Sequence, residues 1–291
     1  MHAMKRVLSF VFVITLTATV TGQDGDPELS MILQRVRERV TRHYLALQSL
    51  AWTDTVKVEA TGEKPRELVY DSIVRLQEPV PGDNAVPFYI RDVSELRAVN
   101  GKPVKKNELP KSTDPRAANM GTLSFLLRSE EQSRNYAFSY AGPADLRGRR
   151  VLRIDINSPQ KTPPKVTWDD AFVFFGVRYH FQVSGLQFTK GVLWVDPETY
   201  EVLRLEWKSD QFEFQRTADS QKIKYETGLK VQFQSMPLAE PNQTIAVPVS
   251  AEFTGIITRD DVRVSRQTHT FSNYKRFTGD AKVISVEAAT K

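Results

Sequence analysis

Hydrophobic and polar residues alternate with a period of two over much of the chain. The clearest stretch is 179–207, which contains three alternating runs at residues 179–183, 192–196 and 202–207. This pattern is typical of β-strands with one face on a core and the other in water. Between the last two runs, Asp196-Pro197-Glu198-Thr199 has turn chemistry, because Pro suits the second position of a type I turn and Asp bonds the backbone two residues on. We therefore predict an antiparallel meander here.

Residues 27–49 follow a helical period instead. Asp26 is suited to cap this helix, and Pro27 fits its first position. The apolar stripe that would face the core consists of Leu29, Ile32, Leu33, Val36, Val40, Tyr44 and Leu47. Such a stripe is typical of an amphipathic helix packed on a protein core. A second, shorter helix is predicted for residues 114–127, where the period is less regular.

The order of these elements predicts the fold class. About ten to twelve strands and two helices are expected, with no βαβ repeat. We predict a mainly β (α+β) protein whose strongly curved antiparallel sheet forms a half-open barrel, with both helices packed in or over its concave face. The composition does not change along residues 23–291, so they are predicted to form a single domain.

The first 22 residues have the three parts of a secretory signal peptide. Lys5 and Arg6 precede an uncharged apolar run at residues 7–20, and small residues lead up to Gly22. The apolar run is too short to span a membrane, and no later stretch is long enough. We expect cleavage near Gly22 and a periplasmic or secreted protein that does not span the membrane.

The composition excludes several classes of function. The chain has no cysteine, which excludes disulfides, thiol catalysis and a lipid anchor on an N-terminal cysteine. Its net charge of +5 is spread along the sequence without a basic run between aromatics. Nucleic-acid binding is therefore not expected.

No catalytic motif is present in the chain. Apart from the signal peptide, its histidines are His43, His180 and His269, which lie on separate elements without metal-ligand spacing. The acidic pairs 169–170 and 260–261 are interpreted as the tips of turns. We accordingly predict neither an enzyme nor a bound metal or cofactor.

The aromatic residues, about a tenth of the chain, lie largely on the apolar side of the strands. In one interpretation they form an ordinary core that the two helices cover fully. In the other interpretation, two helices cannot cover so many strands, and a cleft remains that could bind an apolar ligand. The candidate ligand-binding residues are Trp52, Val56, Tyr70, Phe138, Phe172, Phe175, Tyr179, Phe181, Leu193, Leu203 and Leu205.

Residues 168–175 (WDDAFVFF) have two interpretations of their own. Apolar runs of this length are usually buried connectors or short strands. The alternative is a flap whose phenylalanines close the cleft, with Gly176 and Pro163-Pro164 as pivots.

Two motifs carry a resemblance to a known family. The predicted helix ends in Tyr-Leu-Ala-Leu-Gln-Ser-Leu at residues 44–50 and is followed at once by a strand, and Gly-Val-Leu-Trp-Val-Asp-Pro-Glu-Thr at residues 191–199 leads into another. This arrangement resembles the periplasmic lipoprotein carrier LolA, its receptor LolB and secreted outer-membrane lipoprotein-sorting proteins. The resemblance implies a half-open barrel with helices as a lid over a cavity for acyl chains. The missing cysteine departs from the lipid-anchored receptor.

These observations lead to two hypotheses about function. The first is a periplasmic binding or carrier protein for a lipid, a lipoprotein acyl chain or another apolar ligand held in the concave face. The alternative is a non-catalytic scaffold of the cell envelope, with a filled core and a protein partner.

Overall fold

The computed structural model describes eleven stretches of the chain. They are residues 27–47, 50–77, 89–104, 136–158, 163–174, 177–184, 188–215, 222–237, 244–258, 262–278 and 282–285. The predicted signal peptide (residues 1–22) and the predicted second helix (residues 114–127) lie outside these stretches.

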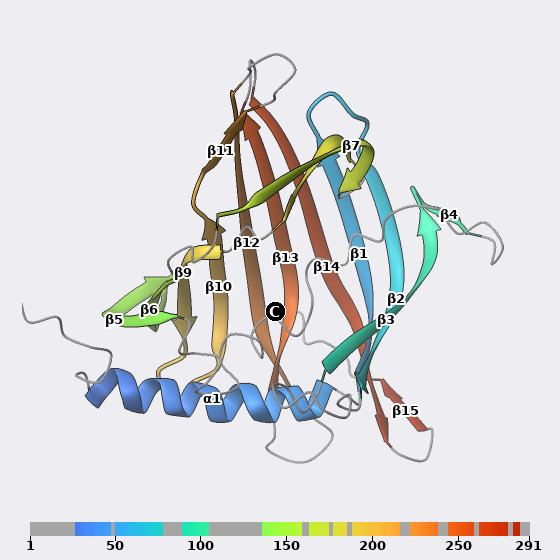
Figure 1. Ribbon diagram of the computed structural model, residues 1–291. Coiled ribbons are helices and arrows are strands. Elements are labelled where there is room, and N and C mark those ends of the chain that lie inside the picture. The colour runs from blue at the N-terminus through green and yellow to red at the C-terminus, as the bar shows by residue number, and fades with distance from the viewer. Residues whose placement is uncertain are drawn as a thin grey trace, which may run out of the picture.

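The described residues form one α-helix and fifteen β-strands (Figure 1). In the first half these are α1 (Pro27–Leu47), β1 (Leu50–Ala60), β2 (Arg66–Gln77), β3 (Tyr89–Val99), β4 (Lys102–Pro103), β5 (Ala137–Leu146), β6 (Arg149–Asn157) and β7 (Lys165–Phe174). In the second half they are β8 (Val177–Ser184), β9 (Phe188–Val195), β10 (Val202–Ser209), β11 (Phe212–Gln215), β12 (Lys222–Pro237), β13 (Thr244–Thr258), β14 (Val262–Thr278) and β15 (Lys282–Ser285).

Thirteen of these strands form one antiparallel sheet in the order β4-β3-β2-β1-β14-β13-β12-β10-β9-β6-β5, with β11 beside β12 and β15 beside β14. β1 and β14 come from opposite ends of the chain and pair at the middle of the sheet. The sheet is not closed into a barrel, because β4 and β5 are its two ends. The class prediction, mainly β with one large curved sheet, is confirmed. The prediction of about ten to twelve strands agrees with the eleven strands on the continuous path of this sheet, beside which the short strands β11 and β15 are added.

The predicted meander at residues 179–207 is wrong in its first strand. β9 and β10 do pair, but β8 pairs with β7 in a separate two-stranded sheet, and the other neighbour of β9 is β6. The β7–β8 hairpin is thus an excursion between two strands that lie side by side. Alternation reports which face of a strand is apolar, and it does not report which strand lies beside it.

The acidic pair at residues 169–170 also differs from its prediction. It lies inside β7 and does not end the strand. Between Trp168 and Phe172, three residues stand opposite one residue of β8, so the strand has a bulge at this point. A β-bulge interrupts the alternation while the strand continues, so a pair of polar residues need not mark a turn.

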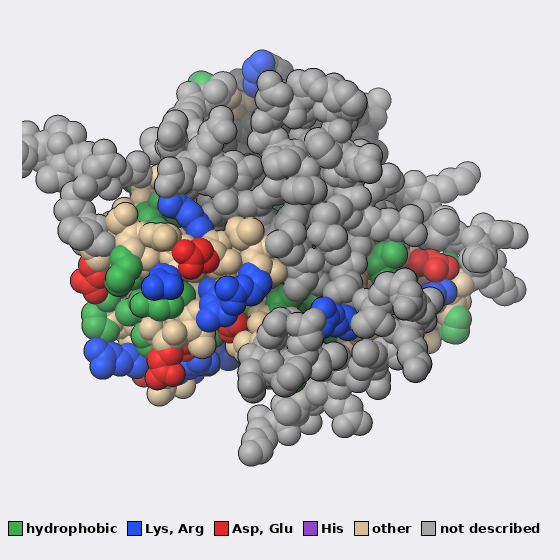
Figure 2. Space-filling model, turned by 90° about the horizontal axis from the view of Figure 1, so that it is seen from below, with side chains coloured by type: hydrophobic (Ala, Val, Ile, Leu, Met, Phe, Trp, Pro, Cys, Tyr) green, Lys and Arg blue, Asp and Glu red, His purple; other side chains and the backbone are tan. Residues whose placement is uncertain are grey.

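The helix α1 runs along one end of the sheet (Figure 1). Its predicted stripe is confirmed where side chains are described: Leu29, Ile32, Leu33, Val36 and Val40 are all buried. Seen from the side of α1, basic and acidic side chains are mixed over its surface (Figure 2). The helix therefore buries one apolar face on the sheet and leaves a charged face to water.

We call the face of the sheet that α1 covers the inner face, and the opposite one the outer face. One row of paired inner residues crosses eight strands: Ile154, Leu193, Leu205, Val231, Ala251, His269, Val56 and Leu68. The adjacent outer row consists of Asp155, Val192, Glu206, Lys230, Glu252, Thr268, Lys57 and Glu67. The two faces thus differ strongly in polarity, and the core lies on the inner one.

Three larger apolar clusters lie along the inner face, together with a smaller one of Ile223, Tyr225 and Ile257. The helix cluster consists of the five α1 residues named above with Phe138, Ile154, Ile156, Leu193, Val195, Val202, Leu205 and Trp207. The central cluster consists of Leu50, Trp52, Leu229, Val231, Met236, Ile245, Val247, Ala251, Phe253, Phe271 and Tyr274. The far cluster consists of Val56, Val58, Leu68, Tyr70 and Leu96. Among the described residues, α1 contributes side chains to the helix cluster alone.

A bulge in β14 keeps its last aromatic residue on the inner face. Ala51 pairs with Lys275 and Thr53 with Ser272, so Asn273 and Tyr274 both stand opposite Trp52. Asn273 has a φ of 53°, a left-handed conformation that Asn tolerates better than most residues. The extra residue shifts the alternation by one, and Tyr274 joins Phe271 in the central cluster.

The helix cluster gives the first prediction. Ile32 is 2% exposed within it, whereas the neighbouring Met31 is 48% exposed on the same helix. Ile32→Ala should lower the free energy of unfolding by about 2–5 kcal/mol, because it leaves a cavity between α1 and the sheet. Met31→Ala should change it by less than about 0.5 kcal/mol. Urea unfolding followed by circular dichroism measures both, and equal effects would show that α1 does not pack as described.

Candidate ligand-binding face

The structure separates the predicted ligand-binding residues into different clusters. Phe138, Leu193 and Leu205 belong to the helix cluster, where α1 fills the space above them. Trp52 belongs to the central cluster, and Val56 and Tyr70 belong to the far cluster. For the first group, the interpretation as ordinary core is the better one. The second group lies in clusters to which the described residues of α1 contribute no side chain.

The strand β10 departs from its predicted alternation at its start. The register shifts between Val202 and Arg204, and Val202, not Leu203, packs with Leu205 and Trp207 in the helix cluster. Leu203 is itself buried but belongs to none of the three clusters. Its predicted role in ligand binding remains a prediction.

Four predicted residues lie on or near the β7–β8 hairpin. Phe172 is on β7, and Tyr179 and Phe181 are on β8, with Phe172 paired to Tyr179. Only the backbone is described at these three positions, and Phe175 lies outside the described residues. The hairpin is a pair of strands outside the main sheet, and a closing role for its phenylalanines remains a prediction.

An aromatic bridge links the helix cluster to the central cluster. The ring of Trp207 stacks on Phe188 at 4.9 Å between centroids, and Phe188 meets Phe253 edge-on at 6.4 Å. Gly191 is paired with Trp207, and a Cβ at this glycine would lie 2.8 Å from the carbonyl oxygen of Glu206 and 3.0 Å from the indole. The absence of a side chain at Gly191 thus makes room for the indole, and the inner face stays continuous across both clusters.

A polar pair is buried between the central and far clusters. Nδ1 of His269 on β14 lies 3.1 and 2.9 Å from the two carboxylate oxygens of Asp54 on β1. The side chain of His269 is 2% exposed and that of Asp54 is 15% exposed. The imidazole stacks on Phe271, with 5.8 Å between centroids. Both residues occupy inward positions of the sheet, where a charged or polar group is costly unless it is paired.

Sequence reasoning missed this pair because its members are 215 residues apart. The alternation in β1 contained one signal. Trp52, Val56 and Val58 are inward and apolar, and Asp54 stands at the inward position between them. A carboxylate at an apolar position of a strand indicates a buried partner.

Tyr274 lies near the same carboxylate. Its hydroxyl donates to the carbonyl oxygen of Pro248, and its ring packs against Trp52 at 6.4 Å. Burial, and secondarily the negative charge of Asp54, raise the pKa of Tyr274 well above its ordinary value. The phenol is therefore neutral at physiological pH and acts as a hydrogen-bond donor to the backbone.

The outer face has a hollow of about 550 Å³ over β6, β9, β10, β12 and β13. Its lining includes Arg153, Lys190 and Lys230 together with acidic neighbours. Arg153 pairs with Asp155 at 2.8 Å, Lys190 with Asp210 at 2.9 Å, and Lys230 with Glu206 at 4.0 Å. Exposed pairs of this kind contribute little energy. The hollow is a solvated surface of mixed charge, lined by four basic and three acidic side chains, and it differs in character from the inner face.

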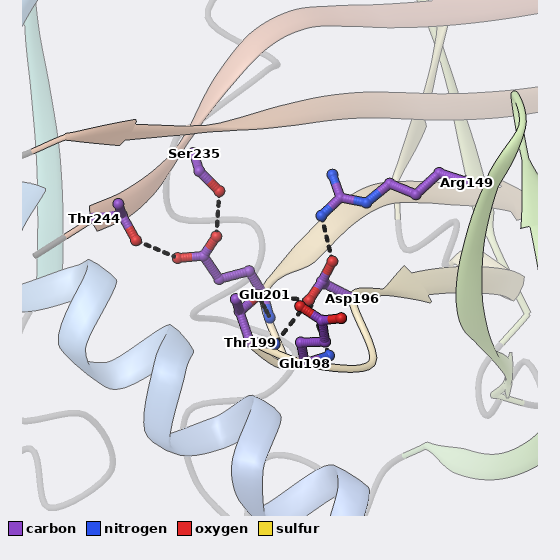
Figure 3. A network of polar contacts seen from close by, with 7 residues as sticks. All are labelled: Arg149, Asp196, Glu198, Thr199, Glu201, Ser235 and Thr244. Carbon is purple, nitrogen blue, oxygen red and sulfur yellow. Dashed lines mark hydrogen bonds and ion pairs between the residues drawn. The ribbon is translucent and has the colours of Figure 1, made fainter. Parts of the chain in front are cut away.

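A second polar network holds the end of the sheet next to α1 (Figure 3). Asp196 Oδ1 accepts hydrogen bonds from the backbone N–H of Glu198 at 3.0 Å and of Thr199 at 2.7 Å, and from the Thr199 hydroxyl at 3.0 Å. Its other oxygen pairs with Arg149 at the start of β6. The predicted turn chemistry of Asp196-Pro197-Glu198-Thr199 is thus confirmed, and the turn is tied to a neighbouring strand.

Glu201 extends this network to β12 and β13. Its carboxylate is buried and accepts hydrogen bonds from the hydroxyls of Ser235 and of Thr244, the latter at 3.4 Å. These two residues stand at the ends of paired strands that meet near α1 (Figure 3). The network therefore fixes the connections of three strand pairs at one end of the sheet, which is a structural role.

Within the described stretches, no three His, Asp or Glu side chains come together as a metal site would require. No described helix is long and apolar enough to cross a membrane.

The Asp196 network gives a prediction about pH. Burial raises the pKa of Asp196, but the bonds from Thr199, Glu198 and Arg149 outweigh it and hold the pKa below its ordinary value of 3.8. The carboxylate therefore stabilises the fold above about pH 4, and this contribution is lost as the pH falls through the lowered pKa. Asp196→Asn should reduce the free energy of unfolding at pH 7 by about 1.5–3 kcal/mol and should weaken its fall in acid.

Asp210 provides the control for this measurement. Its pKa is also lowered, mainly by the hydrogen bond from Lys190, but its side chain is 53% exposed. Asp210→Asn should cost less than about 1 kcal/mol at pH 7. Urea titrations from pH 3 to 7 measure the free energy of unfolding of both variants. If Asp196→Asn lost stability toward acid pH as steeply as the wild type, the role assigned to the network would be contradicted.

Comparison with models of known protein families finds no match, and no curated protein matches the chain. Three solved structures are similar to it over most of their length. An outer membrane lipoprotein-sorting protein domain from Vibrio parahaemolyticus has a TM-score of 0.34 and 13% identity, and covers 85% of this chain and 94% of its own. A LolA superfamily protein from Nitrosomonas europaea has a TM-score of 0.33 and 9% identity, with 86% and 94% coverage. A DUF1329 family protein from Desulfovibrio piger has a TM-score of 0.34 and 12% identity, with 85% and 94% coverage.

Two of these three descriptions name the family that the sequence resembles. At such TM-scores and identities the likeness supports no comparison of individual sites. The function proposed below is therefore drawn from the residues of this chain.

Proposed function

We propose that this protein is a non-catalytic binding or carrier protein for an apolar ligand, such as a lipid or an acyl chain, held on the inner face of the sheet. The observation that carries this proposal is the unequal cover of that face. α1 packs on the helix cluster and, among the described residues, contributes no side chain to the central or far cluster. The inner face is nevertheless continuous from β6 to β2, and it is largely apolar apart from Asp54 and the buried polar residues of β14.

The chemistry of the central cluster suits an acyl chain. The central cluster presents Trp52, Phe253 and Phe271 beside aliphatic residues, all under 10% exposed. Each such side chain gains about 1.5–3 kcal/mol when it is removed from water. Because these residues are buried in this structure, a ligand that binds here must take the place of whatever now covers them. Binding is then accompanied by an opening of the inner face, as in other proteins with lids.

The location that goes with this proposal is the periplasm or the exterior of the cell. The support is the signal peptide predicted at residues 1–22. A protein of this kind solubilises its ligand between membranes and needs no catalytic group, which agrees with the absence of a catalytic motif from the sequence.

Two tryptophans on opposite faces provide a matched test. Trp52 is buried in the central cluster, whereas Trp194 lies on the outer face beneath the guanidinium of Arg204 at 4.8 Å. Trp52→Leu should weaken the binding of phenylnaphthylamine, a fluorescent apolar probe, by about tenfold, because it removes aromatic contact area worth roughly 1–2 kcal/mol. Trp194→Leu should leave the probe affinity unchanged. Fluorescence titration measures both, with circular dichroism to confirm that each variant is folded.

The same experiment distinguishes the alternative function. If the wild-type protein binds no apolar probe, and no lipid accompanies it in native mass spectrometry after purification from the periplasm, the carrier proposal fails. The protein would then be an envelope scaffold with a filled core. Equal loss of binding in both tryptophan variants would place the ligand elsewhere than on the inner face.

A further inference from the structure

The buried His269–Asp54 pair has a feature that the fold does not require. Within the described part of the chain, Nε2 of His269 is buried and has no hydrogen-bond partner. A buried polar nitrogen without a partner destabilises a protein, and such groups persist where they serve a purpose. The opposite nitrogen of the same ring is fully engaged by both oxygens of Asp54.

The pair fixes both the orientation and the tautomer of the imidazole. A carboxylate only accepts hydrogen bonds, so the Nδ1 that faces Asp54 carries the proton. In the neutral ring, Nε2 is then left with its lone pair as an acceptor. Nε2 is at the edge of the ring far from Cβ, and His269 occupies an inward position on β14. The acceptor atom Nε2 therefore lies on the inner face, farther from the backbone of the sheet than the rest of the ring.

The position along the inner face is also informative. His269 lies in the inner row between Ala251 and Val56, which belong to the central and far clusters respectively. These are the clusters that receive no side chain from α1 among the described residues. On β14 the inward neighbours of His269 are Phe271 on one side and the buried polar Gln267 on the other, and the paired residues on β1 and β13 are apolar. An oriented acceptor beside apolar side chains is an arrangement by which small-molecule sites fix the polar end of a mostly apolar ligand.

We propose that Nε2 of His269 accepts a hydrogen bond from the head group of the bound ligand, and that this head group is a hydrogen-bond donor, either a hydroxyl or a protonated amine. This assignment rests on the proposed function and makes it more specific. A carboxylate or a phosphate diester has no hydrogen to donate and would lie near the negative charge of Asp54. The site therefore selects apolar alcohols and amines over fatty-acid anions. Asp54 acts as a positioning residue through the imidazole.

Two comparisons test this assignment, one between ligands with and without a hydrogen-bond donor and one between protein variants. Dodecanol and its methyl ether have nearly the same size and apolar surface, and the ether has lost the donor. Both are used to displace phenylnaphthylamine from the full mature chain, and dodecylamine replaces dodecanol in a second arm. The wild type should bind dodecanol about five- to tenfold more tightly than the ether, the range expected for one buried hydrogen bond. His269→Phe keeps a flat ring and should bind alcohol and ether equally.

The Asp54→Asn variant tests the positioning role of Asp54. If the pair only stabilised the fold, this substitution would not change the preference for alcohol over ether. The introduced amide can turn an N–H toward Nδ1, which transfers the ring proton to Nε2 and makes that atom a donor. The preference for alcohol over ether should then fall toward one. Thr268→Val is the control, because it removes a hydroxyl from the adjacent outward position of the same strand. It should keep the wild-type preference.

The outcomes separate this assignment from the proposed function. If the wild type binds alcohol and ether with equal affinity, or if His269→Phe keeps the preference, the assignment to His269 is wrong while the carrier function stands. If none of the three ligands displaces the probe, both are wrong. Should the variants fail to fold, ¹⁵N-histidine labelling of the wild type decides the question. The Nε2 resonance of His269 should shift with dodecanol and not with the ether, and equal shifts or none would overturn the assignment.

Discussion

The structure depends on the register that aligns inward residues across the strands of one sheet. The row from Ile154 to Leu68 crosses eight strands, and each inward residue meets the next across a strand pair. A slip of one residue in any strand would turn its apolar set to water and its charged set to the core. Bulges correct the alternation where the chain needs it, as at Asn273, which returns Tyr274 to the inner face. The polar network around Asp196 then fixes the turn between β9 and β10 and ties it to β6.

Most of the local structure could be predicted from the sequence, because alternation and capping are local signals. The helix stripe from Leu29 to Val40, the Asp196 turn and the strand pair on either side of it all follow from residues a few positions apart. Strand neighbours could not be predicted in the same way. β6 and β9 are adjacent although the β7–β8 hairpin separates them in the chain, and β1 joins β14 from the opposite end. These pairings are decided by packing over the whole sheet, which a period of two does not encode.

The candidate site, too, could be predicted from the sequence only in its local features. The apolar residues proposed from alternation do lie inward wherever their side chains are described, with Leu203 displaced by the shift in β10. Alternation did not predict which of them α1 would cover: Phe138, Leu193 and Leu205 pack with the helix, and their role in ligand binding stays a prediction. Nor did it predict the partner of Asp54, since a hydrogen bond across the central strand pair joins two distant parts of the sequence.

The position of the hydrogen bond between Asp54 and His269 restricts the roles that the inner face can have. A sheet whose only task was to bury apolar surface would gain from a hydrophobic residue at His269, which contacts aromatic and aliphatic neighbours and is 2% exposed. Asp54 compensates only one side of the ring, so the pair leaves an acceptor buried at an energetic cost. This cost falls between the central and far clusters, to which the described residues of α1 contribute no side chain, and the indole nitrogen of Trp207 carries a similar cost in the helix cluster. A group that destabilises the ligand-free protein and lies among the residues proposed to bind the ligand is explained by recognition more simply than by folding, because a bound donor recovers what burial of the nitrogen has lost.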